Sequence, residues 1–203
     1  MIKWFHSRID KNRKMELKRP EQRIRKITLQ DLCEYVRAQD SDSVRACVEV
    51  LENRFGEVYL GGSIADSAGK GLSKYAAANY QDIDLIVPVP AGTIPPTAGK
   101  LATQALDDIL RTSAGEMVRR ASLEVVPEDE DTRYLDLSGY LARLQLEFMP
   151  SLAALEFYIP KYERWLGRKY FTPTRVDIAF PLEFIARSAR ENGANHIQIS
   201  VER

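Results

Sequence analysis

The sequence predicts an α/β (α+β) fold in which a mixed β-sheet is flanked by helices. Two observations lead to this prediction. In some segments the apolar residues have helical spacing, and in others apolar and polar residues alternate as in a strand. The two kinds of segment follow each other in turn along the chain. Some neighbouring strand segments are joined by short connections, which favours antiparallel pairing beside the parallel pairs. A length of 203 residues and a hydrophobic content of 44% suit one globular domain.

The charged residues are unevenly distributed along the chain. Lys and Arg number 29, Asp and Glu also number 29, and the formal net charge is zero. Residues 1–30 nevertheless carry ten basic and three acidic side chains, a net charge of about +7 that the remainder balances. We therefore divide the chain into a basic arm, residues 1–27, and a domain, residues 28–203. Such an arm suits contact with RNA or another nucleic acid through residues 1–30, and equally suits a solvated or partner-binding helix.

Cysteine usage and hydropathy exclude several classes of protein. Cys33 and Cys47 are the two cysteines and form no CxxC motif, which argues against a disulfide scaffold and a cysteine-rich zinc site. No apolar run approaches the ~20 residues that span a bilayer, and the first residues lack a signal-peptide core. We expect a cytoplasmic protein without a membrane partner, and the sequence leaves its oligomeric state open.

Two helices are predicted near the start of the domain. Thr28 and Asp31 have the spacing of a capping box, and the apolar residues that follow lie on one helical face. Residues 40–43, Asp-Ser-Asp-Ser, interrupt that pattern and are expected to cap the second helix. Gly56 occupies the position of a glycine that ends a helix.

The next segments are the informative ones. Residues 57–60 are a predicted strand that runs directly into Gly61-Gly62-Ser63, and residues 64–80 are a loop or the start of a helix. Residues 82–87 are a second strand, in which Asp82 and Asp84 share one face and the aliphatic residues share the other.

The rest of the domain alternates between helices and strands. A helix is expected to begin at Thr97 or a neighbouring residue, and Pro181 is expected to open a helix that Gly193 closes. Residues 156–171 are not assigned. The predicted strands cover residues 117–126, 143–149, 175–180 and 196–201.

The glycine turn and the aspartate pair have complementary chemistry. A Gly61-Gly62 turn lets the backbone approach an anion closely, and the backbone N–H groups with the Ser63 hydroxyl can hold phosphate oxygens. Asp82 and Asp84 point into one space, where two carboxylates raise each other's pKa unless a divalent cation neutralises them. Hard oxygen ligands favour Mg²⁺ or Mn²⁺. Taken singly, the glycines are usually only a turn and the aspartates only the polar face of an edge strand.

In combination, residues 59–63 (Tyr-Leu-Gly-Gly-Ser) and 81–86 (Gln-Asp-Ile-Asp-Leu-Ile) resemble the nucleotidyltransferase superfamily typified by DNA polymerase beta. The resemblance covers about thirty residues, and the gap between the motifs is longer than in many members, with 73–80 resembling an insertion. It implies a nucleotidyltransferase-like fold in which Asp82 and Asp84 hold Mg²⁺ and an NTP is the substrate. It also implies that Ser63 steadies the β- and γ-phosphates, with Lys70 or Lys74 as a charge partner.

The same resemblance implies a third carboxylate on a later strand, and two residues compete for this position. Asp177 lies opposite the apolar face of the strand over 175–180, and Glu147 does the same in the strand over 143–149. We favour Asp177 because aspartate is the commoner residue in the family. The third carboxylate would bind a metal ion and help to deprotonate the acceptor.

The function implied by the resemblance is metal-dependent transfer of a nucleoside monophosphate from an NTP to an acceptor hydroxyl, with release of pyrophosphate. The alternative is a catalytically inactive protein of the same fold that binds a nucleotide or a protein or RNA partner. Neither the acceptor nor the preferred base can be inferred from these residues.

Overall fold

The computed structural model describes residues 26–37, 40–69, 80–127, 139–149, 173–191 and 193–201, without the side chains of residues 68 and 69. The helices are α1 (Leu29–Tyr35), α2 (Ser41–Phe55), α3 (Gly62–Gly69), α5 (Pro95–Leu110) and α7 (Glu183–Glu191), with a 3₁₀ helix over Ser113–Met117. The strands are β1 (Lys26–Thr28), β2 (Val58–Leu60), β3 (Ile83–Ile86), β4 (Val118–Val125), β5 (Tyr140–Phe148), β6 (Thr174–Pro181) and β7 (Ile197–Ser200).

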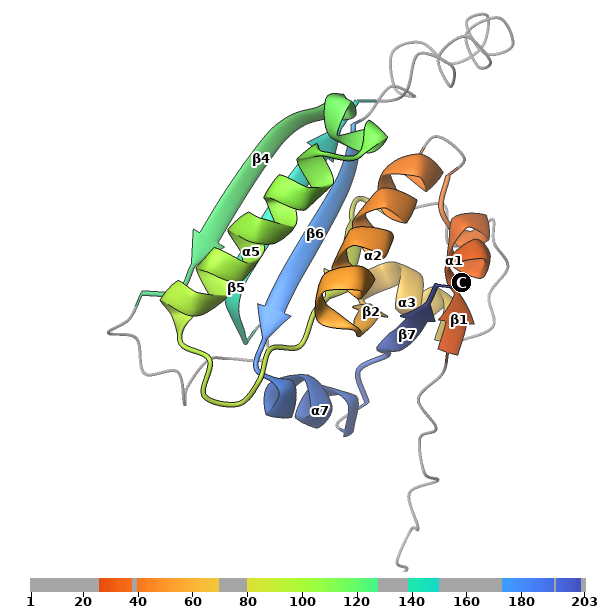
Figure 1. Ribbon diagram of the computed structural model, residues 1–203. Helices are drawn as coiled ribbons and strands as arrows, with labels where there is room; N and C mark the ends of the chain where they lie inside the picture. The colour runs from red at the N-terminus through yellow and green to blue at the C-terminus, as the bar shows by residue number, and fades with distance from the viewer. Residues whose placement is uncertain are drawn as a thin grey trace, which may run out of the picture.

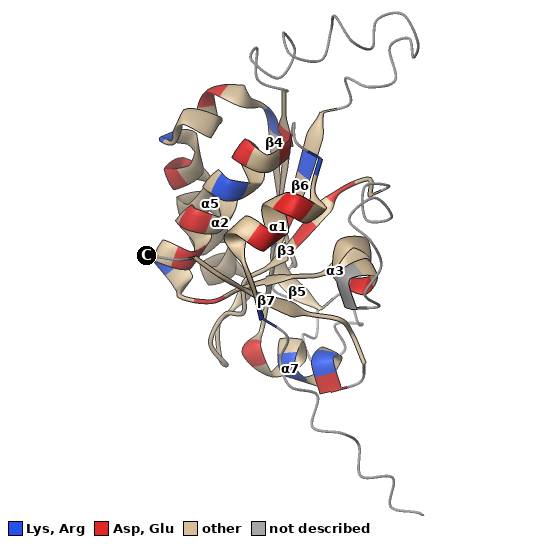
Figure 2. Cartoon of the chain, turned by 90° about the vertical axis from the view of Figure 1, so that its right-hand side faces the viewer, with Lys and Arg blue, Asp and Glu red and all other residues tan. Residues whose placement is uncertain are grey.

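The strands form one mixed sheet in the order β1-β7-β2-β3-β6-β5-β4 (Figure 1). Strands β1 and β7 pair in parallel, as do β3 and β6, whereas the remaining neighbours are antiparallel. Helices α2 and α5 cover one face of the sheet and α3 lies on the other (Figure 2). The predicted mixed sheet flanked by helices is therefore confirmed.

The core lies between the sheet and helices α2 and α5. Alternate residues of the central strands point into it, because successive side chains of a strand face opposite sides. Fully buried members from both layers include Leu51, Ile109, Leu85, Leu144, Ile178 and Phe180. The intervening residues of β3, β6 and β5 face the opposite side of the sheet, and these include the polar residues of the candidate site.

The local signals for the first two helices are confirmed. The backbone N–H of Asp31 donates to Thr28 Oγ1 at 3.0 Å, and the N–H of Thr28 donates to the Asp31 carboxylate at 3.1 Å, which is a complete capping box. Gly56 follows α2 with φ of 81°, and its N–H donates to the Glu52 carbonyl at 2.8 Å. A residue with a side chain is strained at this φ.

The predicted position of the α2 cap is correct, but other details of the prediction are wrong. Asp40 occupies the N-cap position of α2, but its side chain makes no capping hydrogen bond. Pro181 does not open a helix: it ends β6, and α7 begins at Glu183. The sheet begins at Lys26, because Lys26 and Ile27 pair with β7 and so belong to the sheet rather than to the arm.

Other predictions fall outside the described residues. These are the rest of the basic arm through residue 25, the unassigned segment 156–171, and Lys70 and Lys74. In the parts of the chain that the structure describes, no helix combines the length and apolar character needed to cross a membrane.

Candidate metal-binding site

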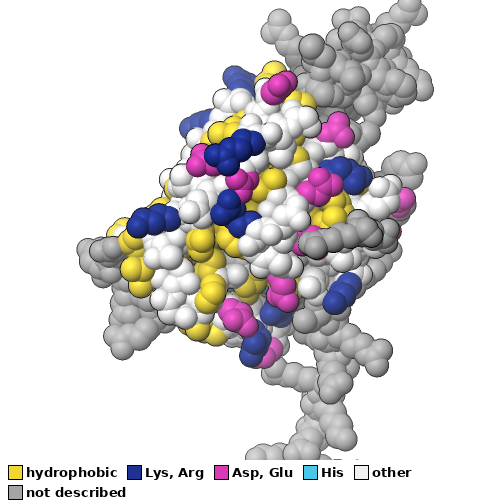
Figure 3. Space-filling model, viewed as in Figure 1, with side chains coloured by type: hydrophobic (Ala, Val, Ile, Leu, Met, Phe, Trp, Pro, Cys, Tyr) yellow, Lys and Arg dark blue, Asp and Glu magenta, His cyan; other side chains and the backbone are white. Residues whose placement is uncertain are grey.

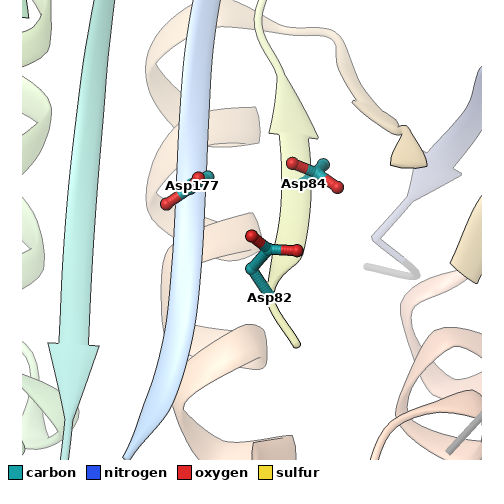
Figure 4. A group of neighbouring side chains, drawn as sticks. All are labelled: Asp82, Asp84 and Asp177. Carbon is teal, nitrogen blue, oxygen red and sulfur yellow. The ribbon is translucent and has the colours of Figure 1, made fainter. Parts of the chain in front are cut away.

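Three aspartates meet at the centre of the sheet. Asp84 lies in β3, Asp177 lies in β6, and Asp82 immediately precedes β3 (Figure 4). One carboxylate oxygen from each lies within 4.8 Å of those of the other two. Three hard oxygen ligands at this separation match the ligands that Mg²⁺ and Mn²⁺ prefer. We refer to Asp82, Asp84 and Asp177 as the aspartate triad.

The strand pairing explains why residues far apart in sequence meet here. Strands β3 and β6 are parallel neighbours, and Asp84 is directly opposite Asp177 in their register. Ile83, Leu85 and Ile178 point into the core and are fully buried, so the aspartates between them face the other side. In Figure 4, α2 lies behind the sheet as seen from the triad, which places the triad on the face opposite α2.

The glycine turn lies directly against the triad. The N–H of Gly61 donates to the backbone carbonyl of Asp84 at 2.9 Å. Gly62 has φ of 61°, and a Cβ there would lie 1.8 Å from Asp84 Oδ2. The sequence predicts that the Gly61-Gly62 backbone closely approaches an anion. In the structure, the Asp84 carboxylate is one such anion. Both the close contact and the left-handed conformation require glycine at position 62.

Gly62→Ala is therefore expected to destabilise the protein by about 2 kcal/mol or more, because the methyl group adds a clash to the strain of the left-handed backbone. It should also displace Asp84 and weaken Mn²⁺ binding. Urea denaturation and a Mn²⁺ titration measure the two effects. Gly92→Ala is the matched control, since Gly92 has φ of 89° but a Cβ there would meet nothing within 4 Å. Equal Mn²⁺ affinity in both variants would contradict the assignment.

Two residues of β5 that the sequence reading missed complete the site. The guanidinium of Arg143 contacts the carboxylate of Asp177 in a short ion pair, and Gln145 Nε2 lies 3.4 Å from the same carboxylate. Arg143 also packs over the Tyr140 ring, with 5.9 Å between the guanidinium carbon and the ring centroid. The alternation of residues 143–148 places Arg143 and Gln145 on one face of their strand, but only the β5–β6 pairing brings that face to Asp177.

The surroundings of Asp84 make its carboxylate harder to ionise. Burial, followed by the neighbouring charges of Asp82 and Asp177, raises its pKa to about 6, and the charge of Arg143 acts in the opposite direction. Close carboxylates in a partly buried site resist ionisation in this way. A divalent cation would reverse the balance by stabilising the ionised form.

Metal binding is expected to weaken as the pH falls through about 6, because protons and the cation compete for Asp84. The apparent Mn²⁺ affinity should drop about tenfold between pH 7 and pH 5.

The stability of the metal-free protein changes with pH in the opposite direction. Since the pKa of Asp84 lies above its ordinary 3.8, the folded chain holds this proton more tightly, and stability declines as the pH rises from 3.8 to about 6. Calorimetric Mn²⁺ titrations and thermal melts across this range check both signs.

Glu147, the alternative third carboxylate, is not part of the cluster. It lies in β5, and its carboxylate pairs with Arg175 Nε at 3.2 Å. In the register of the sheet it faces Arg120 on one side and Arg175 on the other. The structure thus brings Asp177, and not Glu147, to Asp82 and Asp84.

The remaining predicted site residues are only partly placed. Gly61 is buried and precedes α3, whereas Ser63 is exposed in the first turn of that helix, so its hydroxyl is accessible beside the triad's glycine turn. The N-terminus of a helix favours negative charge, which suits a phosphate near Ser63. Lys70 lies outside the described residues.

The buried carboxylate of Asp40 accepts hydrogen bonds from the segment that precedes β3 and from the first residue of β6. Asp40 is fully buried and accepts hydrogen bonds from the hydroxyls of Tyr80 and Thr174 and, at 2.7 Å, from Arg37 Nε. Tyr80 is two residues before Asp82, and Thr174 is three residues before Asp177. Burial and the Asp40 charge raise the pKa of Tyr80 well above its usual range, which keeps its hydroxyl a donor.

Together, the aspartate triad, the glycine turn and Arg143 form one polar site on the face of the sheet opposite α2. The site has the ligands for a divalent cation and, at Gly62 and Ser63, a helix start suited to an anion. Protein-family models, curated proteins and solved structures were compared with the chain, and none of them matches it.

Proposed function

We propose that this protein is a metal-dependent nucleotidyltransferase that transfers a nucleoside monophosphate from an NTP to an acceptor hydroxyl. The observation that carries the proposal is the meeting of Asp82, Asp84 and Asp177 beside the Gly61-Gly62 turn. An acidic site alone would suit many cations. The adjoining helix start, with its exposed hydroxyl at Ser63, adds a place for phosphate and so favours a nucleotide.

Each group of the site has a role in this reaction. Asp82 and Asp84 would hold the Mg²⁺ that serves the triphosphate, and Asp177 would hold the Mg²⁺ that serves the acceptor. When bound, Mg²⁺ would supply charge neutralisation at the triphosphate and a lower pKa of the acceptor hydroxyl. The hydroxyl oxygen attacks the α-phosphorus, the bond between that phosphorus and the bridging oxygen breaks, and pyrophosphate leaves. Asp177 would accept the hydroxyl proton.

A second candidate function is nucleotide binding without turnover. It is favoured by the ion pair between Arg143 and Asp177, because a guanidinium that occupies this carboxylate competes with a cation for the same oxygens. A protein of this kind would bind an NTP in a metal-dependent way through Asp82 and Asp84 and release no product.

One experiment separates the candidates. The full chain is titrated with Mn²⁺ and a non-hydrolysable NTP analogue, and pyrophosphate release is measured with each of the four NTPs, with and without total RNA as acceptor. Binding together with pyrophosphate release supports the transferase, and binding alone supports the second candidate. Absence of metal-dependent nucleotide binding would overturn both. Glu147→Gln is the control, because Glu147 carries a charge on the same face of the sheet but lies outside the triad.

A further inference from the structure

Strand β4 is an edge strand of the sheet in the part of the chain that the structure describes. It is the last strand in the sheet order and, among the described strands, pairs only with β5. Seven of its eight residues are exposed. Leu123 and Val125 are 40% and 37% exposed, although they are apolar and lie on the side of the sheet that α5 covers. An exposed edge strand of this length presents unpaired backbone groups and is a template for another strand.

Beside this edge lies an apolar groove between β4 and α5. Its lining consists of Pro96, Gly99, Lys100, Thr103, Gln104, Leu123 and Val125. Figure 3 shows hydrophobic side chains at the left of the molecule, where α5 and β4 lie. The groove and the open strand edge are continuous, so a strand added to β4 would also cover Leu123.

The polar face of the same edge carries charges in an alternating row. Arg143 contacts Asp177, and Glu124 lies directly opposite Arg143 in the pairing of β4 with β5. Farther along the same two strands, Arg120 lies opposite Glu147, and Glu147 pairs with Arg175. Two rows of charged side chains thus cross β5 and end on β4. The row through Arg143 ends in the carboxylate of Glu124, and the row through Glu147 ends in the guanidinium of Arg120.

We propose that a second copy of this chain adds to the edge, with the two β4 strands antiparallel and Ser122 of one copy opposite Ser122 of the other. In this register Arg120 lies opposite Glu124 of the second copy, and the two-fold axis repeats the pair. The two rows of charged side chains then join into a single row in which acidic and basic side chains alternate. This row runs from Asp177 of one copy to Arg175 of the other. On the opposite face, Leu123 meets Ala121 of the second copy.

The register follows from the side-chain faces and from charge. Arg120, Ser122 and Glu124 lie on one face of β4, and residues directly opposite each other in an antiparallel pair must share a face. Centring the pairing on Ala121 or Leu123 instead removes both Arg120–Glu124 contacts. The irregularity at Arg119 lies outside the five central residues and leaves them free to pair. Centring the pairing on Arg120 or Glu124 places like charges directly opposite each other, which opposes those registers.

The decisive test is a charge-reversal cycle, read by sedimentation equilibrium of the full chain. The natural chain is expected to dimerise reversibly, and Arg120→Glu or Glu124→Arg should each weaken the dimer by about tenfold or more. Combining the two substitutions should regain most of the loss. If the substitutions acted only through contacts within one chain, the double variant would lose more than either single variant. The reason is that it places a carboxylate at position 120 opposite Glu147 and a guanidinium at position 124 opposite Arg143. Arg187→Glu and Glu191→Arg, on α7, make the same charge changes away from this edge and should leave the dimer unchanged.

A cysteine scan reads the register directly. Ser122→Cys should form a disulfide-linked dimer under mild oxidation, because directly opposite Cα atoms of an antiparallel pair lie within the range of a disulfide. Glu124→Cys should not, since its two copies would be separated by four residues, about 13 Å. The natural chain, with Cys33 and Cys47, is the blank. A monomer at all concentrations would overturn the proposal, as would a dimer indifferent to both charge reversals. These outcomes do not depend on nucleotide turnover.

Discussion

Asp84→Asn is expected to abolish metal-dependent nucleotide turnover and, at the same time, to raise the melting temperature of the metal-free protein at pH 7. The loss of activity should be about a thousandfold or more, because bound cations contribute several kcal/mol of charge stabilisation in such reactions. The gain in stability should be a few degrees, about 2–4 °C for each kcal/mol of repulsion removed. Pyrophosphate release and thermal melts without metal measure the two effects.

The opposite signs have one physical cause. The pKa of Asp84 is raised to about 6 by burial and by the charges of Asp82 and Asp177, so ionised Asp84 is unfavourable in the folded, metal-free chain at pH 7. The neutral amide of asparagine removes that cost. It also removes an anionic ligand from the site, so added Mn²⁺ should raise the melting temperature of the natural chain much more than that of the variant.

Two further variants sharpen the result. Asp177→Asn should also lose activity but should gain no stability, because Asp177 is paired with Arg143 and its loss leaves the guanidinium without that partner. Glu147→Gln should retain metal binding, since its carboxylate pairs with the largely exposed Arg175 outside the triad. If Asp84→Asn lost as much stability as Asp177→Asn, ionised Asp84 would not be unfavourable in the folded, metal-free chain. Loss of Mn²⁺ binding in Glu147→Gln would restore Glu147 as the third carboxylate.

The features predictable from the sequence are those set by neighbouring residues. The capping box of Thr28 and Asp31 and the end of α2 at Gly56 depend on contacts within a single turn. The shared face of Asp82 and Asp84 likewise follows from strand alternation alone. Pro181 misled the prediction because proline suits both the first turn of a helix and the end of a strand, and here the pairing of β6 with β5 extends to it.

The features that the sequence could not supply depend on which strands become neighbours. Asp84 and Asp177 are about ninety residues apart in the chain, and their meeting requires the parallel pairing of β3 with β6. Residue patterns place Asp177 and Glu147 equally well on polar strand faces, so alternation cannot choose between them. Arg143 was missed for the same reason, because its contact with Asp177 exists only through the pairing of β5 with β6.

Asp40→Ala is expected to have the largest effect on stability, a loss of about 3–5 kcal/mol, which is the usual cost of removing one partner of a buried charged pair. Asp40 is fully buried and accepts hydrogen bonds from Arg37, Tyr80 and Thr174. The alanine variant leaves these donors unsatisfied and opens a cavity at the start of α2. Tyr80→Phe removes one donor and leaves the carboxylate, so its loss should be about 1 kcal/mol. Urea denaturation measures both.

The same contacts should also control the triad. Tyr80 and Thr174 stand two and three residues before Asp82 and Asp177, so releasing them from Asp40 loosens the starts of β3 and β6 together. Mn²⁺ affinity should therefore fall about tenfold in Asp40→Ala under conditions where the variant is still folded, because the partners that orient metal ligands typically matter by this factor. Leu51→Ala, a fully buried change in α2, should destabilise by a comparable amount but removes none of the hydrogen bonds that Asp40 accepts. If Leu51→Ala weakened Mn²⁺ binding as much as Asp40→Ala, general destabilisation would account for the loss, and Asp40 would have no positioning role.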